Sequence, residues 1–484
     1  MKTCTTARGQ WHLPGIPVLL CAAIVSIGAL SKSHALEISD HVQTIYAQGR
    51  GEGIGVTSNG SRILISSPID TSGGAELTFS SFVPGFRHIP RQNDPFSPNS
   101  NPALPGEVTD VAALLSGGFD IAVVRSDSNS PVNALISLKD GTVINQYPIP
   151  AQPDGMEVTP DGTYAIVAVE KGGEIRIYDL SRGPEAITLV AVVTRAALVA
   201  YFQNMPERAG VDYANVEPEA VGIAADSSFA LVTIQDAASV AIIDLAAMSQ
   251  AIEEGGLTPD QVGDRTLKNV VHLPFGIKGS NGALFGVEPD GVAISPDGDF
   301  ALLALEANQR AKHIQGIAVL DLRNGLTGNI PTTSYSIFGV DPSLLANTGL
   351  TEAPDASATF YPSDANKLPR LDPAGIKMVK FEQTVVAPLV IERYDPSAAQ
   401  VTASTTNEVR GSVLFLDVTN VLSTGLTPAN VLKRLRIGEP GSRLEGIDTA
   451  QHGRWIFVSI SNGGGTKGSA VRLEIIKDEE ASTP

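Results

Sequence analysis

The sequence predicts an all-β fold, a seven-bladed β-propeller closed by an N-terminal strand, with short helical and loop insertions. Three observations support this prediction. A unit of two short apolar strands joined by a tight turn recurs about seven times, most units continue into a third strand ending in Asp, and a lone strand at 42–47 precedes the first unit. The last unit offers only three strands, so we expect the N-terminal strand to complete it and remove an open sheet edge.

Residues 1–35 have the layout of a secretory signal peptide: a basic start, an apolar run, and small residues before the expected cleavage after Ala35. The remaining 36–484 are expected to form a single domain. Both cysteines, Cys4 and Cys21, leave with the signal, which excludes disulfides and thiol chemistry from the mature chain. We therefore expect a periplasmic or secreted monomer with no membrane span.

The chain is acidic. Its formal net charge of −18 becomes −21 once the three basic residues of the signal are removed. Such a surface repels polyanions, so nucleic acid and anionic membranes are not expected partners. Cations and cationic ligands are favoured instead.

The repeat is clearest in four units. They read QPDGMEVTPDGTYAIVAVE from Gln152, EPEAVGIAADSSFALVTIQ from Glu217, EPDGVAISPDGDFALLALE from Glu288 and RLEGIDTAQHGRWIFVSIS from Arg443. Weaker copies begin at Gly51 and Thr109, and a degenerate copy begins at Pro373. The Asp-Gly pairs between the two strands of a unit are typical of tight hairpin turns.

The chain is longer than compact propeller repeats require, so we expect insertions. Helical composition marks two of them, at about 195–215 and 246–262. A third, at about 333–371, is rich in Pro, Ser and Asn and has little periodicity.

These repeats resemble secreted bacterial propellers of the YVTN/lactonase-like group, which are similar to WD40 propellers in architecture. The units from Glu217 and Glu288 are most similar to the propeller of the choice-of-anchor I family, which is described as alkaline-phosphatase-like. The resemblance covers about four units and implies the fold. It leaves the activity open, because the group includes both lactonases and binding modules.

One acidic residue recurs at the same point of six units, at the entry to the first strand. Because the first strand of each unit lines the central channel, these carboxylates are expected to converge on one mouth of it. Oxygen ligands of this kind suit Ca²⁺ or Mg²⁺. The alternative is that each acid accepts backbone N–H bonds and holds neighbouring units in register. The six predicted metal ligands are Glu52, Asp110, Asp154, Glu219, Asp290 and Glu445, and Ala374 takes this position in the degenerate unit.

A second set of side chains is expected near the same mouth. Glu170 and Glu306 end the second strands of their units, and the loop after Glu306 carries Arg310, Lys312 and His313. This basic loop in an acidic protein could meet a phosphate or carboxylate of a ligand. The alternative is an ordinary solvated loop.

Local catalytic motifs are missing from the sequence, which contains no G-x-S-x-G elbow and no Walker A loop. We expect no nucleotide or redox cofactor. The favoured function is a module that binds an unknown small-molecule or protein ligand. The alternative is a metal-assisted hydrolase of a lactone or phosphate ester, with Glu219 or Glu445 as base. A third hypothesis places a partner surface on the insertions.

Overall fold

The computed structural model describes the strands, their nearest turns and four helices. The described residues are 36–40, 42–45, 53–58, 62–67, 76–81, 107–114, 118–126, 132–139, 142–202, 215–273, 277–278, 284–285, 288–306, 316–323, 373–392, 411–426, 430–438, 442–450, 452–460 and 470–477. The predicted signal peptide and the expected insertion at 333–371 lie outside them. The chain divides into two units, residues 1–36 with 477–484 and residues 37–476, and the arrangement below is that of the second.

Antiparallel pairing joins the strands into separate sheets. Four sheets combine consecutive strands: β6 (Glu107–Ala113), β7 (Asp120–Arg125), β8 (Ala134–Lys139) and β9 (Thr142–Pro148); β10 (Met156–Val158), β11 (Tyr164–Val169), β12 (Glu174–Asp179) and β13 (Thr188–Val193); β14 (Pro218–Ile223), β15 (Phe229–Ile234), β16 (Ser239–Asp244) and β17 (Leu267–His272); β23 (Pro373–Ile376), β24 (Val379–Phe381), β25 (Thr384–Ile391), β26 (Ser412–Asp417) and β27 (Val431–Arg436).

The two ends of the chain share a further sheet. It contains β28 (Leu444–Ala450), β29 (Trp455–Ile460) and β30 (Ala470–Lys477) with the N-terminal β1 (Leu36–Ile38) and β2 (Gln43–Ile45). Strand β2 runs antiparallel to β30, with Gln43 opposite Arg472. The Ser39 backbone N–H also donates to the Glu474 carbonyl at 3.0 Å. The last sheet therefore takes its outer strands from the beginning of the chain.

Three smaller sheets complete the described strands. Two have three strands each and one has two: β3 (Ile54–Val56), β4 (Arg62–Ser67) and β5 (Glu76–Ser81); β20 (Glu288–Ile294), β21 (Phe300–Glu306) and β22 (Gly316–Asp321); β18 (Ile277–Lys278) and β19 (Leu284–Phe285). The units of β3 and β20 thus contribute three strands each among the residues described.

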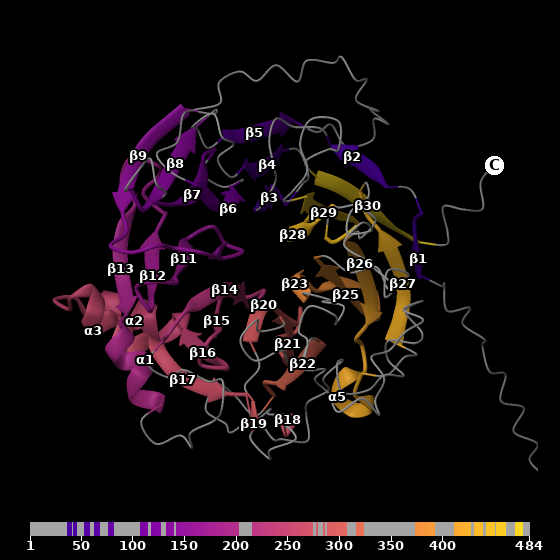
Figure 1. Ribbon diagram of the computed structural model, residues 1–484. Helices are drawn as coiled ribbons and strands as arrows, with labels where there is room; N and C mark the ends of the chain where they lie inside the picture. Colours follow the sequence, from indigo (N-terminus) through magenta and orange to yellow (C-terminus); the bar gives the residue numbers. More distant parts are fainter. Residues whose placement is uncertain are drawn as a thin grey trace, which may run out of the picture. The chain divides into compact units, whose positions relative to one another are not determined.

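The sheets stand in a ring around a central axis (Figure 1). Their innermost strands contact one another in the order β3, β6, β10, β14, β20, β23 and β28, and β28 returns to contact β3. With only a few short helices besides, the architecture is an all-β propeller, as the repeats predict.

The hydrophobic core lies between neighbouring sheets, and β21 illustrates how it forms. Phe300, Leu302 and Ala304 pack toward the sheet of β25 and β26, whereas the alternate Leu303 and Leu305 pack toward the sheet of β15 and β16. Side chains alternate between the two faces of a strand, so an unbroken apolar run buries both faces. This explains the long apolar runs in the middle of each unit.

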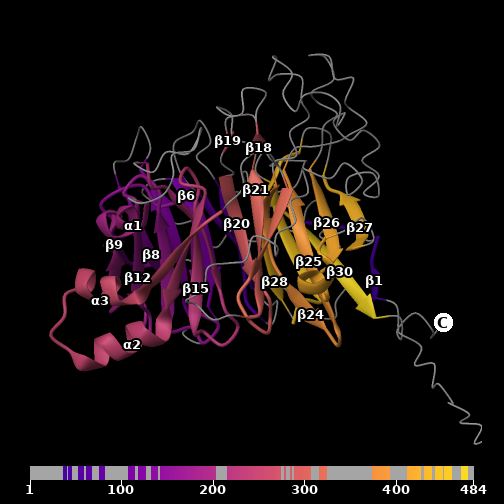
Figure 2. The same cartoon turned by 90° about the horizontal axis from the view of Figure 1, so that it is seen from below.

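The helices lie at the edge of the ring. They are α1 (Arg195–Phe202), α2 (Leu245–Glu254), α3 (Pro259–Thr266) and α5 (Val421–Thr424). Helix α2 starts at Asp244, whose carboxylate accepts the Ala247 N–H at 2.9 Å, and Thr258 with Gln261 form a capping box for α3. Figure 2 shows α2 and α3 projecting beside the sheets. Among the described residues, no helix combines the length and the apolar character needed to cross a bilayer.

The Asp-Gly pairs form turns, as predicted. Asp161 accepts the Thr159 hydroxyl at 2.6 Å and the Thr163 N–H at 2.9 Å, and Gly162 has a φ of 73° that favours glycine. In the unit of β28, the exposed His452 takes the position of Asp161 and has a φ of 56°, and Gly453 takes the position of Gly162 and has a φ of 85°. These residues therefore shape hairpins.

Candidate functional site

Acidic residues from several innermost strands line one cavity on the axis, with a volume of about 430 Å³. Five of the six predicted acids contribute to its lining: Asp110, Asp154, Glu219, Asp290 and Glu445. Ala374 of the degenerate unit lines it too. The predicted Glu52 lies outside the described residues. The sequence repeat therefore identified side chains that the fold brings together from five different sheets.

The residue after the acid explains how the strands come so close. A Cβ atom added to Gly155 would lie 2.2 Å from the Glu219 carbonyl oxygen, and one added to Gly291 would lie 2.2 Å from that of Ala374. Only glycine lets the backbones of neighbouring units approach at these points. Neighbouring backbones are close here, and the acids beside these glycines, Asp154 and Asp290, line the same cavity.

Asp110 corrects the sequence alignment by one residue. Strand pairing places Asp110 opposite Val123, as Gly291 lies opposite Ala304, and the unpaired bulge residue is Thr109 in β6 and Asp290 in β20. Thr109 therefore occupies the acid position of this unit. The sequence TDV lies in a weak repeat that can be aligned in two ways, one residue apart. The sequence does not distinguish them, but in a strand a shift of one residue reverses the direction of the side chain.

The Asp110 carboxylate still lines the cavity, and it joins two units. One oxygen accepts the N–H of Met156 in the next sheet at 2.8 Å, and the other accepts the N–H of Val111 at 2.8 Å. Burial raises the pKa of Asp110 to about 7, although both hydrogen bonds oppose this shift. This acid holds neighbouring units in register, which is the alternative that the sequence left open.

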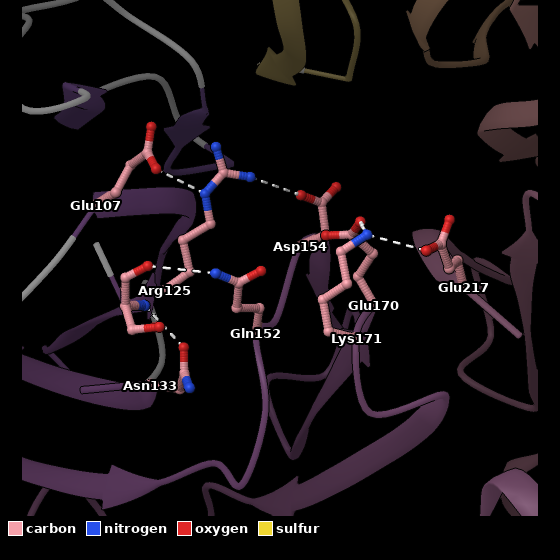
Figure 3. A network of polar contacts seen from close by, with 9 residues as sticks. Glu107, Arg125, Asn133, Gln152, Asp154, Glu170, Lys171 and Glu217 are labelled. Atoms are coloured by element: carbon pink, nitrogen blue, oxygen red, sulfur yellow. Dashed lines mark hydrogen bonds and ion pairs between the residues drawn. The ribbon is translucent and has the colours of Figure 1, made fainter. Parts of the chain in front are cut away.

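Lysine and arginine side chains meet the acids at the mouth (Figure 3). The Arg125 guanidinium lies 2.7 Å from Glu107 and 3.5 Å from Asp154. Lys171 contacts Glu170 and lies 2.9 Å from a Glu217 oxygen.

On the other side of the ring, Arg443 contacts Glu392 and lies 3.5 Å from Glu445. The sequence analysis overlooked these cations, although Lys171 and Arg443 stand within two residues of a predicted acid.

Asp154 is a predicted acid with other carboxylates nearby. Burial raises its pKa to about 6, Glu170 and Glu445 add to the rise, and Arg125 and a hydrogen bond with Glu219 oppose it. Three acids nearby, Glu170, Glu217 and Glu219, each offer an oxygen within 4.8 Å of the others. Two of them were predicted for this mouth, and Glu217 is new. Such a group of oxygens could hold a hard cation.

A second charged level lies deeper in the same cavity, and the sequence analysis did not find it. Lys377 Nζ lies 2.5 Å from a Glu157 oxygen, and Asp448 stands nearby. Asp448 accepts the N–H groups of Val56 and Thr449, both at 2.7 Å, and burial raises its pKa to about 6.

The signal for this level was present in the repeat. Three residues after the acid position, three units carry Glu157, Lys377 and Asp448, and the other four carry a small residue, namely Gly55, Ala112, Gly222 and Ala293. The long side chains extend into the channel that the small ones leave open.

The remaining predicted ligand residues are placed only in part. Glu170 lies at the mouth, and Glu306 pairs with Glu288 at the end of β21. The side chain of Glu306 and the loop with Arg310, Lys312 and His313 lie outside the described residues.

Comparison with known proteins gives a family model that matches part of the chain. Residues 90–254, about a third of the chain, match the model of the choice-of-anchor I domain. No curated protein matches the sequence. Among solved structures, hydrazine synthase of Kuenenia stuttgartiensis is similar with 11% identity and a TM-score of 0.49, over 90% of this chain and 97% of that one.

Proposed function

We propose, from the premise that this chain is a choice-of-anchor I-like propeller, that it is a binding module of the cell surface or the secreted space whose channel mouth holds a cation. One observation carries the proposal. Among the described residues that line the cavity, seven are acidic and one, Lys377, is basic. In a concave site with walls of low dielectric constant, the electric field of such an excess of negative charge is focused, and the site attracts cations.

The cation that suits this mouth is Ca²⁺. Glu170, Glu217 and Glu219 supply carboxylate oxygens only, and oxygen ligands in a flexible arrangement favour Ca²⁺ over transition metals. Asp110 and Asp448 are poorer ligands, because backbone amides already occupy both of their oxygens, whereas Lys171 contacts one oxygen each of Glu170 and Glu217. Of the six predicted metal ligands, the proposed site therefore includes Glu219 and does not include Asp110.

We also propose that strands from the N-terminus close the ring by completing its last sheet. The innermost strands of seven sheets follow one another round the axis, and β2 pairs with β30. A closed ring keeps the mouth residues of different sheets at constant separation. Such rigidity is what a binding site built from many short strands requires.

Calcium titration tests the proposal. We expect CaCl₂ to release or absorb heat in calorimetry and to raise the melting temperature of the wild-type chain, since a ligand at about 100 times its Kd adds roughly 2.7 kcal/mol. Glu219→Gln should lose both effects. Glu254→Gln, the same change on the exposed end of α2 outside the channel, should keep them.

Absence of heat and of thermal stabilisation in the wild type would contradict the cation proposal. A separate assay addresses the hydrolase alternative. Turnover of p-nitrophenyl phosphate or of a simple lactone that EDTA abolishes would replace the binding module by a metal-assisted hydrolase.

A further inference from the structure

The deep level of the channel contains a cation that belongs to the protein itself. Lys377 is the only basic residue among the described residues that line the cavity, and it belongs to the unit that has Ala374 in place of the acid. The unit that lacks a carboxylate at the mouth thus places an ammonium group three residues further along the same inner segment.

The contact between Lys377 and Glu157 crosses the ring. Glu157 lies in β10 and Lys377 directly follows β23, and the sheets of these strands are not neighbours in the order of innermost strands. Where both partners are described residues, the other ion pairs join groups of one sheet, of neighbouring sheets, or of the adjacent helices α2 and α3. The Glu157–Lys377 pair is therefore a bar across the channel.

Three carboxylates surround the ammonium group of this bar. Burial disfavours the charge of Lys377, but Glu157, Asp448 and Asp110 outweigh this effect and raise its pKa. The side chains of Lys377 and Glu157 keep 26% and 31% of their surfaces exposed, and both line the cavity. A cation that moved down from the mouth would meet this permanent positive charge.

We infer that Lys377 is a specificity-determining residue: its ammonium group fills the deep acidic level, so the channel accepts ligands with one cationic centre and rejects extended dications. This inference rests on the proposed function, since it assumes that cations bind at the mouth. Beyond the proposed function, it specifies the class of cation that the mouth accepts.

Alkylammonium ions of matched length test the inference. The mouth and deep positions are three residues apart along a strand, roughly 10 Å, which hexane-1,6-diammonium can span. In the wild type, we expect it to bind no more than about threefold tighter than hexylammonium, since two equivalent ends account for a factor of about two.

Lys377→Met should bind hexane-1,6-diammonium at least about tenfold tighter than hexylammonium. Without the lysine, the second ammonium group of hexane-1,6-diammonium reaches Glu157 and Asp448. Lys139→Met removes the same charge from the exposed end of β8 and should behave as the wild type does. A tenfold preference for the dication in the wild type, or none in Lys377→Met, would overturn the inference.

The variant leaves Glu157 without its partner, which can prevent folding. Where Lys377→Met fails to fold, the double variant Glu157→Gln with Lys377→Met serves instead, because the charges of Asp448 and Asp110 still attract an ammonium group at the position of Lys377. The same tenfold gain is expected from it, and its absence would count against the inference in the same way.

A second measurement separates this inference from the proposed function. Brief acetylation of the unliganded wild type, read by mass spectrometry, should modify Lys139 and spare Lys377, whose ammonium group is bound to Glu157. Equal modification of both lysines would refute the bar. If no cation binds at the mouth and Lys377 is still spared, the proposed function fails and the bar across the channel stands.

Discussion

At the scale of single residues, the acids of the channel divide into two kinds according to what their oxygens contact. Asp110 and Asp448 accept backbone N–H groups from the next unit, so they hold the ring together. Glu219 and Glu170 instead gather at the mouth with Glu217. A recurring acid in a repeat sequence therefore does not have one function throughout, since its role depends on which donor lies within reach.

The pKa of Asp110 leads to a prediction about stability and pH. Its folded-state pKa of about 7 lies above the ordinary 3.8, so its stabilising contribution is complete below about pH 4 and is lost as pH rises through 7. Asp110→Asn removes this loss and can still accept one N–H bond. Relative to the wild type, the variant should gain about 2 kcal/mol between pH 5 and pH 8, allowing for water in the channel.

Urea unfolding at the two pH values measures this gain. Asp226→Asn is the matched control, because Asp226 lies in an exposed turn and Ser228 lowers its pKa. A lowered pKa contributes stability that is lost only in acid, so the control should differ from the wild type by the same amount at pH 5 and pH 8. If the difference in unfolding free energy between Asp110→Asn and the wild type is also the same at both pH values, Asp110 does not titrate near neutrality.

At the scale of elements, helix α3 shows how an insertion is fixed to the ring. It packs on β13, and Gly263 faces the Val192 carbonyl so closely that an added Cβ atom would lie 1.9 Å from the oxygen. The buried Val262 and Thr266 lie on the same short helix. The insertion is therefore part of the core of this side of the ring.

This contact predicts that Gly263→Ala lowers the free energy of unfolding by about 2 kcal/mol, since overpacking costs more than alanine gains in helix propensity. Asp264→Ala, at the next and exposed position, should change it by less than about 0.5 kcal/mol. Thermal unfolding of both variants compares the two effects. If Gly263→Ala and Asp264→Ala melt at the same temperature, the packing of α3 on β13 does not require glycine at position 263.

At the scale of the whole molecule, the stability of the ring depends on how its ends meet. Strand β28 contacts β3, and the N-terminal strands pair with β30. Without them β30 would present an open edge, which promotes association with other chains. We therefore expect residues 36–45 to contribute to the stability of the ring.

A chain that begins at residue 46 tests this task against a chain that begins at residue 36. The shorter chain should melt at a temperature lower by roughly 5 °C or more and should associate in size-exclusion chromatography. Identical melting temperatures and elution volumes would show that β1 and β2 are dispensable for closure.

Much of the fold could be predicted because its signals are local. Apolar runs, Asp-Gly turns and the recurring acid each occupy a few consecutive residues, and they indicated the strands, the hairpins and five lining side chains. The same approach placed Asp110 one position too early, since no turn or glycine anchors the alignment in that weak unit. Glu157, Lys377 and Asp448 share one position of the repeat, so they could have been found in the sequence. The residue type at this position differs from unit to unit, which hides the pattern.

The sequence by itself determined that a repeated strand pattern brings acids from several units toward a common axis, because side-chain direction in a strand follows from position alone. Only the tertiary structure decided which cation meets which acid. Glu157 and Lys377 are separated by 220 residues, and closure of the ring sets their distance. Contacts between sheets depend on the curvature of the whole ring, which no single unit encodes.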